Sequence, residues 1–221
     1  MVVNTDLVDP VPTSLADLLK PEYAGQVALA GDPRTANNAA MAVMAAGIAR
    51  GGEPGQAAAE AGLGFFAELN AAGNFVPVDG STGTLAQGTT PILIDWDYNG
   101  LSRRDELAGN PPVEVVVPSD AALAGVYVQA ISAHAPHPNA AKLWMEHLYS
   151  DEGQLLWLEG YCRPVRLDDL LARNAVPEEL LANLPTSSAE TVFPTLEQQE
   201  ANAETIRNGW DSVVGAEIAP E

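Results

Sequence analysis

The sequence predicts an α/β fold. Short apolar runs alternate with longer Ala-rich or amphipathic segments through the first half of the chain, which is typical of a largely buried sheet with helices between its strands. The length of 221 residues and the 47% share of hydrophobic residues suit one large domain or two small ones. No apolar run reaches the roughly 18 residues that predict a membrane-spanning helix.

The elements are predicted in chain order from the apolar runs and from the residues that end them. Thr13 or Ser14 can cap a short helix near residues 15–19. The run 26–30 is predicted to be a strand because Gly31-Asp32-Pro33 follows it. Further strands are predicted at 75–78, 91–96, 113–118 and 125–132, and helices at 38–50, 56–69, 139–148, 151–159, 167–173, 177–184 and 196–214.

The charge balance restricts the class of ligand. Thirty acidic residues against 10 basic ones give a formal charge of −20, which repels phosphate backbones and excludes nucleic acid as a partner. The acidity either provides solubility or attracts a cationic ligand. Cys162 is the sole cysteine of the sequence, so neither an intrachain disulfide nor a Cys-based metal site is expected. The first residues lack the basic start and apolar core of a signal peptide.

Motifs for catalysis are not found. His134 and His137 stand in a turn with Pro136 and Pro138, so they do not share a helix face as metal ligands would. The sequence contains no nucleophile elbow, P-loop or dinucleotide-binding fingerprint. We therefore expect no catalytic residue, no metal and no cofactor. The segment 80–83, which includes Ser81, resembles a phosphate-cradling loop only loosely, since a plain turn uses the same residues.

The segment 32–38 is the first candidate for ligand binding. It follows a predicted strand and opens a predicted helix, where backbone N–H groups lack helical acceptors. Together with Thr35, Asn37 and Asn38, these N–H groups suit a polar or anionic ligand group, and Arg34 would add positive charge. The alternative interpretation is ordinary helix capping.

The segment 91–100 is the sharper candidate. Its apolar strand ends at Trp96, Asp97 and Tyr98, and in open α/β sheets ligands bind beyond the carboxyl ends of strands. An aromatic ring beside a carboxylate suits an amine or another cation. Alternatively, Trp96 belongs to the core and Asp97 caps a helix. The predicted ligand-binding set is Thr35, Asn37, Asn38, Ser81, Trp96, Asp97, Tyr98 and Tyr127.

Several segments resemble the extracellular solute-binding proteins of ABC importers. Residues 12–29 resemble the entry into the second lobe of that family, 88–96 the strand leading to the cleft, and 115–120 followed by 125–131 the return through the hinge. The most specific segment is Ala135-Pro-His-Pro-Asn-Ala-Ala-Lys-Leu-Trp-Met-Glu-His-Leu-Tyr-Ser-Asp-Glu-Gly-Gln154. Residues 160–166 are similar to the iron(III), polyamine and phosphonate branches.

The resemblance implies a type II periplasmic binding protein-like fold, with one complete lobe plus part of the second. Residues 1–117 would form the second, C-terminal lobe, and 118–160 the hinge return with a segment of the first lobe. Residues 161–221 would be helices that pack back on the second lobe. Most of the N-terminal lobe would be missing. Its absence would expose apolar residues that normally pack on it, namely Leu143, Trp144, Leu148, Leu155, Leu156 and Trp157.

The function implied is capture of a small polar organic solute and its delivery to an ABC importer. The partners would be that solute, the permease subunits, and the missing lobe or a second chain. The location would be periplasmic or extracellular, with a lipid anchor in the full-length protein as one option. The alternatives are a ferric-ion-binding protein, an enzyme or a ligand-sensing domain of the same fold. The ferric branch carries two adjacent tyrosines where this chain has Tyr98 alone. The polyamine branch has a tryptophan matched by Trp96, but Tyr127 replaces its carboxylate.

Overall fold

The computed structural model describes residues 1–220, which divide into two compact units. The first unit comprises Met1–Gly125 and the chain from Pro185 onward, and the second comprises Val126–Leu184. The sequence placed boundaries at 117 and 160, whereas the structure divides the chain after 125 and after 184. Residues 161–184, expected to pack back on the second lobe, thus cluster with the second unit. The assignment of these units to lobes stays a prediction.

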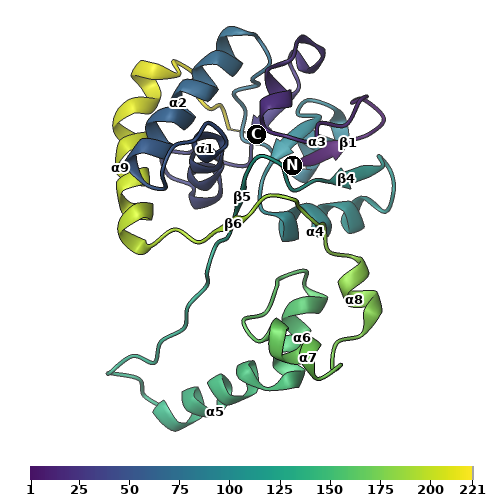
Figure 1. The fold of residues 1–221 in the computed structure, drawn as a ribbon, viewed down its shortest axis with the longest axis vertical. Coiled ribbons are helices and arrows are strands. Elements are labelled where there is room, and N and C mark those ends of the chain that lie inside the picture. Colours follow the sequence, from purple (N-terminus) through teal and green to yellow (C-terminus); the bar gives the residue numbers. More distant parts are fainter. Residues whose placement is uncertain (221) are drawn as a thin grey trace. The chain divides into compact units, whose positions relative to one another are not determined.

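A four-stranded mixed sheet forms the centre of the first unit (Figure 1). Its order is β2-β3-β1-β4, with strands β1 (Val2–Asn4), β2 (Val27–Leu29), β3 (Ile92–Ile94) and β4 (Val113–Val115). β2 and β3 are parallel, with Leu29 opposite Ile94, while β1 runs antiparallel to β3 and β4. Because β2 and β3 are parallel, their carboxyl ends meet at one edge of the sheet.

Both faces of the sheet are buried at β1, β2 and β3, and the two-residue side-chain period divides their residues between the two faces. Val3, Val27, Leu29, Ile92 and Ile94 belong to the large core cluster on one face. The intervening residues Val2, Ala28 and Leu93 belong to the cluster on the other face, with Leu85. The predicted α/β fold with a buried sheet is confirmed.

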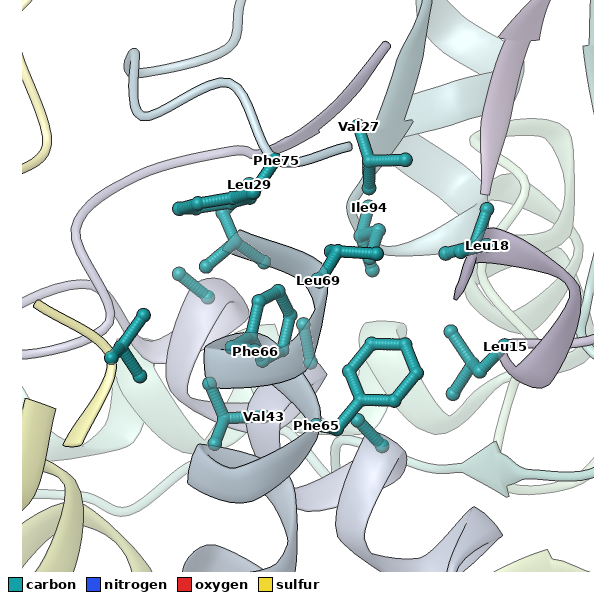
Figure 2. Packing of buried hydrophobic residues seen from close by; sticks show 14 of the residues in the cluster. Leu15, Leu18, Val27, Leu29, Val43, Phe65, Phe66, Leu69, Phe75 and Ile94 are labelled. Atoms are coloured by element: carbon teal, nitrogen blue, oxygen red, sulfur yellow. The ribbon is translucent and has the colours of Figure 1, made fainter. Parts of the chain in front are cut away.

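Helices α1 (Asn37–Ala49), α2 (Gln56–Ala71) and α9 (Leu196–Val213) pack together on the large-core side. Figure 2 shows Phe65, Phe66 and Leu69 of α2 pointing toward the strands. The α1–α2 crossing depends on glycine: a β-carbon at Gly47 would overlap the carbonyl of Ala58. Phe66 and Phe75 also pack around Trp210 of α9. Trp210 is fully buried, and its Nε1 donates a 2.8 Å hydrogen bond to the Ala216 carbonyl.

The opposite side carries α3 (Thr82–Gln87) and α4 (Asp97–Leu107), which contact β1 and β4 respectively. α4 approaches the sheet closely at Gly100, where a β-carbon would lie 2.7 Å from Val2 Cγ2. The first unit also contains the short 3₁₀ helices Ala16–Leu19 and Pro21–Tyr23. A parallel two-stranded pair joins β5 (Ala122–Leu123) to β6 (Thr191–Val192).

The second unit is helical, with α5 (Pro138–Tyr149), α6 (Asp151–Glu159), α7 (Leu167–Ala172) and α8 (Glu178–Ala182). Leu148, Leu158 and Leu170 are its buried leucines, while Leu143, Trp144, Leu156 and Trp157 are exposed. The expected exposure of α5 and α6 apolar residues is therefore correct for those four and wrong for Leu148, which packs within the unit, while Leu155 is half-buried. Among the described residues, no helix has the length and apolar character needed to cross a bilayer.

Other expectations were wrong in detail. The segment 125–132 forms no strand, because β-branched residues adopt one only where a partner strand is available. The segment 75–78 contributes only bridges at Phe75 and Val78. β1, α3 and α4 were not predicted. β1 is only three residues long, and Gly100 and Leu101 are the buried residues of α4, so its apolar period is weak.

Candidate functional site

The candidate site lies at the carboxyl edge of β2 and β3. Three helices begin beside this edge: α1 at Asn37, α3 at Thr82 and α4 at Asp97. The first N–H groups of a helix have no acceptor within it, and the helix dipole adds partial positive charge there. The sequence thus brings three sets of donors to the sheet edge where α/β proteins bind ligands.

The buried side chain of Asp95 is hydrogen-bonded to residues of α1 and α4. Its side chain is 0% exposed. Its Oδ1 accepts hydrogen bonds from Asn38 Nδ2 at 3.2 Å, Trp96 N at 2.8 Å and Asn99 Nδ2 at 3.1 Å, and its Oδ2 accepts one from Arg103 Nη2 at 2.9 Å. A buried carboxylate is tolerated only when it is paired and hydrogen-bonded in this way.

Arg103 extends the network to α3. Its Nη1 donates to Thr82 Oγ1 at 3.0 Å, and Thr82 Oγ1 donates in turn to Glu106 at 3.3 Å. Ser81 starts α3 by a capping box with Thr84, whose backbone N donates to Ser81 Oγ at 3.1 Å. The predicted site residue Ser81 is therefore a helix cap, and its role toward a ligand stays a prediction.

Of the residues predicted around the start of α1, Thr35 lies before the helix and Asn37 and Asn38 are its first two residues. Thr35 and Asn37 are exposed, and Asn38 is half-buried by its contact with Asp95. Ala36 is the N-cap of α1 and no side chain caps that helix, so the capping alternative for Thr35 and Asn37 is wrong.

The expectation that Arg34 adds positive charge to this edge was wrong, because its guanidinium is paired with acidic residues. Its guanidinium donates to both oxygens of Asp32, at 2.9 and 2.7 Å, and to Asp211 at 2.6 Å, with Glu217 also within ion-pair distance. These bonds raise the pKa of Arg34 and lower that of Asp32. Arg34 instead joins the turn after β2 to α9 and the C-terminal tail.

Trp96 is the N-cap residue of α4 and is half-buried. Its side chain packs against the buried cluster of Met41, Met44 and Ala58, which Ile48 and Leu123 also cover. The structure thus supports the interpretation of Trp96 as a packing residue. Its half-buried ring leaves the ligand-stacking role a prediction.

Asp97 and Tyr98 are the first two residues of α4, and both are half-buried. Asp97 Oδ1 accepts a 2.9 Å hydrogen bond from Tyr98 N. An acidic residue in a first helical turn is favoured by the helix dipole. Tyr127 belongs to the second unit, where its side chain is 70% exposed. Its assignment to the site stays a prediction.

This edge can hold a polar molecule by hydroxyl, amide and N–H groups, with one carboxylate at Asp97. Across residues 1–220, no three His, Cys, Asp or Glu side chains gather as a metal site would require. Sequence reasoning missed Thr82, Asp95, Asn99 and Arg103. The four-residue spacing of Asn99 and Arg103 is the helical signal that could have found these two, and Asp95 continues that spacing just before the helix.

Comparison with known proteins identifies the class. The model of the family "Bacterial extracellular solute-binding protein" matches residues 1–187. The chain therefore belongs to this family, whose members act outside the cytoplasm. Comparison with curated proteins finds no match.

Solved structures of ABC-transporter binding proteins share the fold. An ABC transporter protein from Clostridium perfringens matches with a TM-score of 0.65 and 18% identity over 96% of this chain and 66% of its own. The spermidine/putrescine binding protein PotD from Streptococcus pneumoniae matches with a TM-score of 0.57 and 16% identity, over 100% and 59%. AfuA from Actinobacillus pleuropneumoniae, with fructose-6-phosphate bound, matches with 0.57 and 16%, over 97% and 65%.

These matches confirm the predicted type II periplasmic binding protein-like fold. The chain spans less than two thirds of the length of the solved chains it matches. It corresponds to part of their fold, as the resemblance implied.

Proposed function

We propose that the first unit forms one wall of a cleft that captures a small polar organic solute for delivery to an ABC importer. The observation that carries this proposal is the meeting of three helix starts at the carboxyl edge of β2 and β3, around the Asp95–Arg103 pair. Such an arrangement presents preformed donors, so little ordering free energy is lost on binding.

The charges nearby narrow the solute class. Arg103 pairs with Asp95 and Arg34 with Asp32, so both guanidiniums are already neutralised. The wall then offers neutral donors and the Asp97 carboxylate, which suit hydroxyl and carbonyl groups and one amine. A ferric ion is disfavoured, because Tyr98 has no adjacent tyrosine.

The remaining partners are part of the proposal. The opposing wall of the cleft is provided by the missing N-terminal lobe, as part of a longer protein or as a second chain, and the closed protein docks on the permease subunits. A lipid anchor stays a prediction. The chain does not transform its solute, since the edge presents neither a nucleophile with its base nor a metal ligand set.

Residue-resolved NMR tests the proposal, because it detects weak binding by a single wall. Putrescine, fructose-6-phosphate and ferric citrate are added separately to the labelled chain at millimolar concentration. We expect one organic solute to shift the signals of Asn37, Asn38 and the Trp96 indole, saturably, and to be recovered unchanged by mass spectrometry. Shifts confined to α2 or α9, or a chemically altered solute, would refute the proposal.

A further inference from the structure

We infer that Asp95 and Arg103 are positioning residues that hold the starts of α1, α3 and α4 together at the sheet edge. That these helix starts bind a solute rests on the proposed function, whereas the hydrogen bonds that hold them together do not. Asp95 is 0% exposed and cannot touch a solute itself. Any effect on binding must therefore pass through the residues that it holds.

Asp95 fixes two of the helices. It follows β3 directly, and its Oδ1 receives Asn38 from α1 and Asn99 from α4. Both amides donate to the same oxygen, so the first turn of α1 is tied to the first turn of α4 through one atom. Hydrogen bonds to a charged acceptor are stronger than neutral ones, which suits this carboxylate to the role.

Arg103 fixes the third helix. Its guanidinium fork gives one amino group to Asp95 and the other to Thr82, the first residue of α3. The planar fork sets the angle between these two bonds, which a lysine cannot reproduce. Arg103 lies on α4, which begins two residues after Asp95, so the rigid helix carries the guanidinium back toward the carboxylate that precedes it.

The pair also explains why α1 has no capping side chain. A cap would occupy the first N–H groups, whereas Asn38 anchors the helix from the side and leaves the helix end to a ligand. At α1 the network thus holds the helix start through the Asn38 side chain and not through its first backbone N–H groups.

Amide hydrogen exchange on the full chain tests this inference without a solute. In Asp95→Asn and Arg103→Met, the first amides that are hydrogen-bonded within α1, α3 and α4, those of Ala40, Leu85 and Gly100, should exchange roughly tenfold faster or more, with α2 and α9 unchanged. Arg104→Met is the matched control, one position along the same helix, where the arginine pairs with exposed Asp105. It should leave all three helix starts as in the wild type.

Arg103→Lys is the milder variant if Asp95→Asn fails to fold, and it should accelerate exchange mainly at the start of α3. Equal acceleration in all helices, or none at the three starts, would overturn the inference. The NMR titration is a separate readout. If exchange responds locally while the wild type binds no solute, the positioning role stands and the proposed function falls.

Discussion

The ring of Trp96 lies against Gly125, which stands two residues after β5 and ends the first segment of the first unit. A β-carbon at position 125 would stand 3.0 Å from Trp96 Cη2 and 3.2 Å from Cζ2. The same ring packs against Met41 and Met44 of α1. Trp96 therefore connects the candidate site to the strand that leads out of the first unit.

Gly125→Ala should disturb this contact. Because the new methyl group would meet the indole closer than ordinary van der Waals distance, we expect a loss of about 1 kcal/mol in the free energy of unfolding and a changed chemical shift of the Trp96 indole. Gly160→Ala is the control, since its β-carbon would meet atoms no closer than 3.5 Å. Urea unfolding and NMR measure both effects, and an unmoved Trp96 signal in Gly125→Ala would contradict the contact.

The α1–α2 crossing gives a second prediction from two glycines on one helix. A β-carbon at Gly62 would overlap the carbonyl of Val43, whereas one at Gly64 meets only the end of Arg50 at 4.0 Å. Gly62→Ala should lower the free energy of unfolding by about 1–3 kcal/mol. Gly64→Ala should raise it by about 0.5–1 kcal/mol through helix propensity. Equal effects in urea unfolding would show that the helices do not meet at Gly62.

The sequence could predict the parts of the structure that have a strong local period. α1, for example, was expected at 38–50 and spans Asn37–Ala49. α4 could not be found in this way, because its sequence Asp-Tyr-Asn-Gly-Leu-Ser-Arg-Arg-Asp-Glu-Leu presents almost no apolar stripe. Its position depends on Gly100, which fits closely over Val2.

For the candidate site, too, the sequence pointed to some residues and missed others. The carboxyl-edge rule led to the segments around Asn38 and Trp96, both of which donate to Asp95 at the end of β3, and their role toward a ligand stays a prediction. The role of Asp95 could not be predicted, because its partners Asn38 and Arg103 come from separate elements whose meeting is set by the fold. The expectation that Arg34 adds positive charge to the site was wrong for a related reason. Its partner Asp211 is 177 residues away in sequence, so the ion pair could not be foreseen.

Arg34→Met should loosen the C-terminal tail. Arg34 holds Asp211 and Glu217, and just beyond them the Ala219 N donates a 2.9 Å hydrogen bond to the Pro77 carbonyl. We expect faster amide exchange at Ala219 in this variant. Arg50→Met, which removes the ion pair with Glu68 between α1 and α2, should leave that amide unchanged.

The same variant predicts a pH dependence. The hydrogen bonds from Arg34 lower the pKa of Asp32 in the folded state. A carboxyl whose folded pKa is lowered adds stability above its unfolded pKa, about 4, and loses it as the pH falls through the folded pKa. The stability difference between wild type and Arg34→Met should thus be full near pH 7 and shrink in acid. Acid unfolding of both proteins measures this. If the stability difference grew as the pH fell below about 4, the Arg34–Asp32 ion pair would be contradicted.

The exposed apolar residues of the second unit predict association or dye binding. Leu143 and Trp144 of α5 are 71% and 57% exposed, and apolar patches of this kind mark interaction surfaces. The chain should bind a hydrophobic dye, and Leu143→Ser with Trp144→Ser should lower the dye fluorescence. Leu7→Ser, which removes a 52% exposed leucine of the first unit, is the control. A monodisperse monomer that binds no dye would remove this prediction.

The last prediction separates the two interpretations of Trp96. As a packing residue against the cluster of Met41, Met44 and Ala58, it should stabilise the chain even without a solute. Trp96→Ala should then lower the free energy of unfolding by about 2–3 kcal/mol, somewhat less than for a fully buried tryptophan. Trp144→Ala, at a residue 57% exposed, should change it by less than about 0.5 kcal/mol.

Trp96→Phe completes the comparison, since phenylalanine keeps an aromatic face but not the full reach of the indole toward Gly125. If Trp96 also stacks on the solute, Trp96→Phe should retain much of the affinity for the organic solute identified by NMR, whereas Trp96→Ala should lose it. Trp144→Ala should leave that affinity unchanged. An unfolding free energy unaffected by Trp96→Ala, together with lost affinity, would show that Trp96 is an open stacking surface and that its packing against α1 contributes nothing to stability.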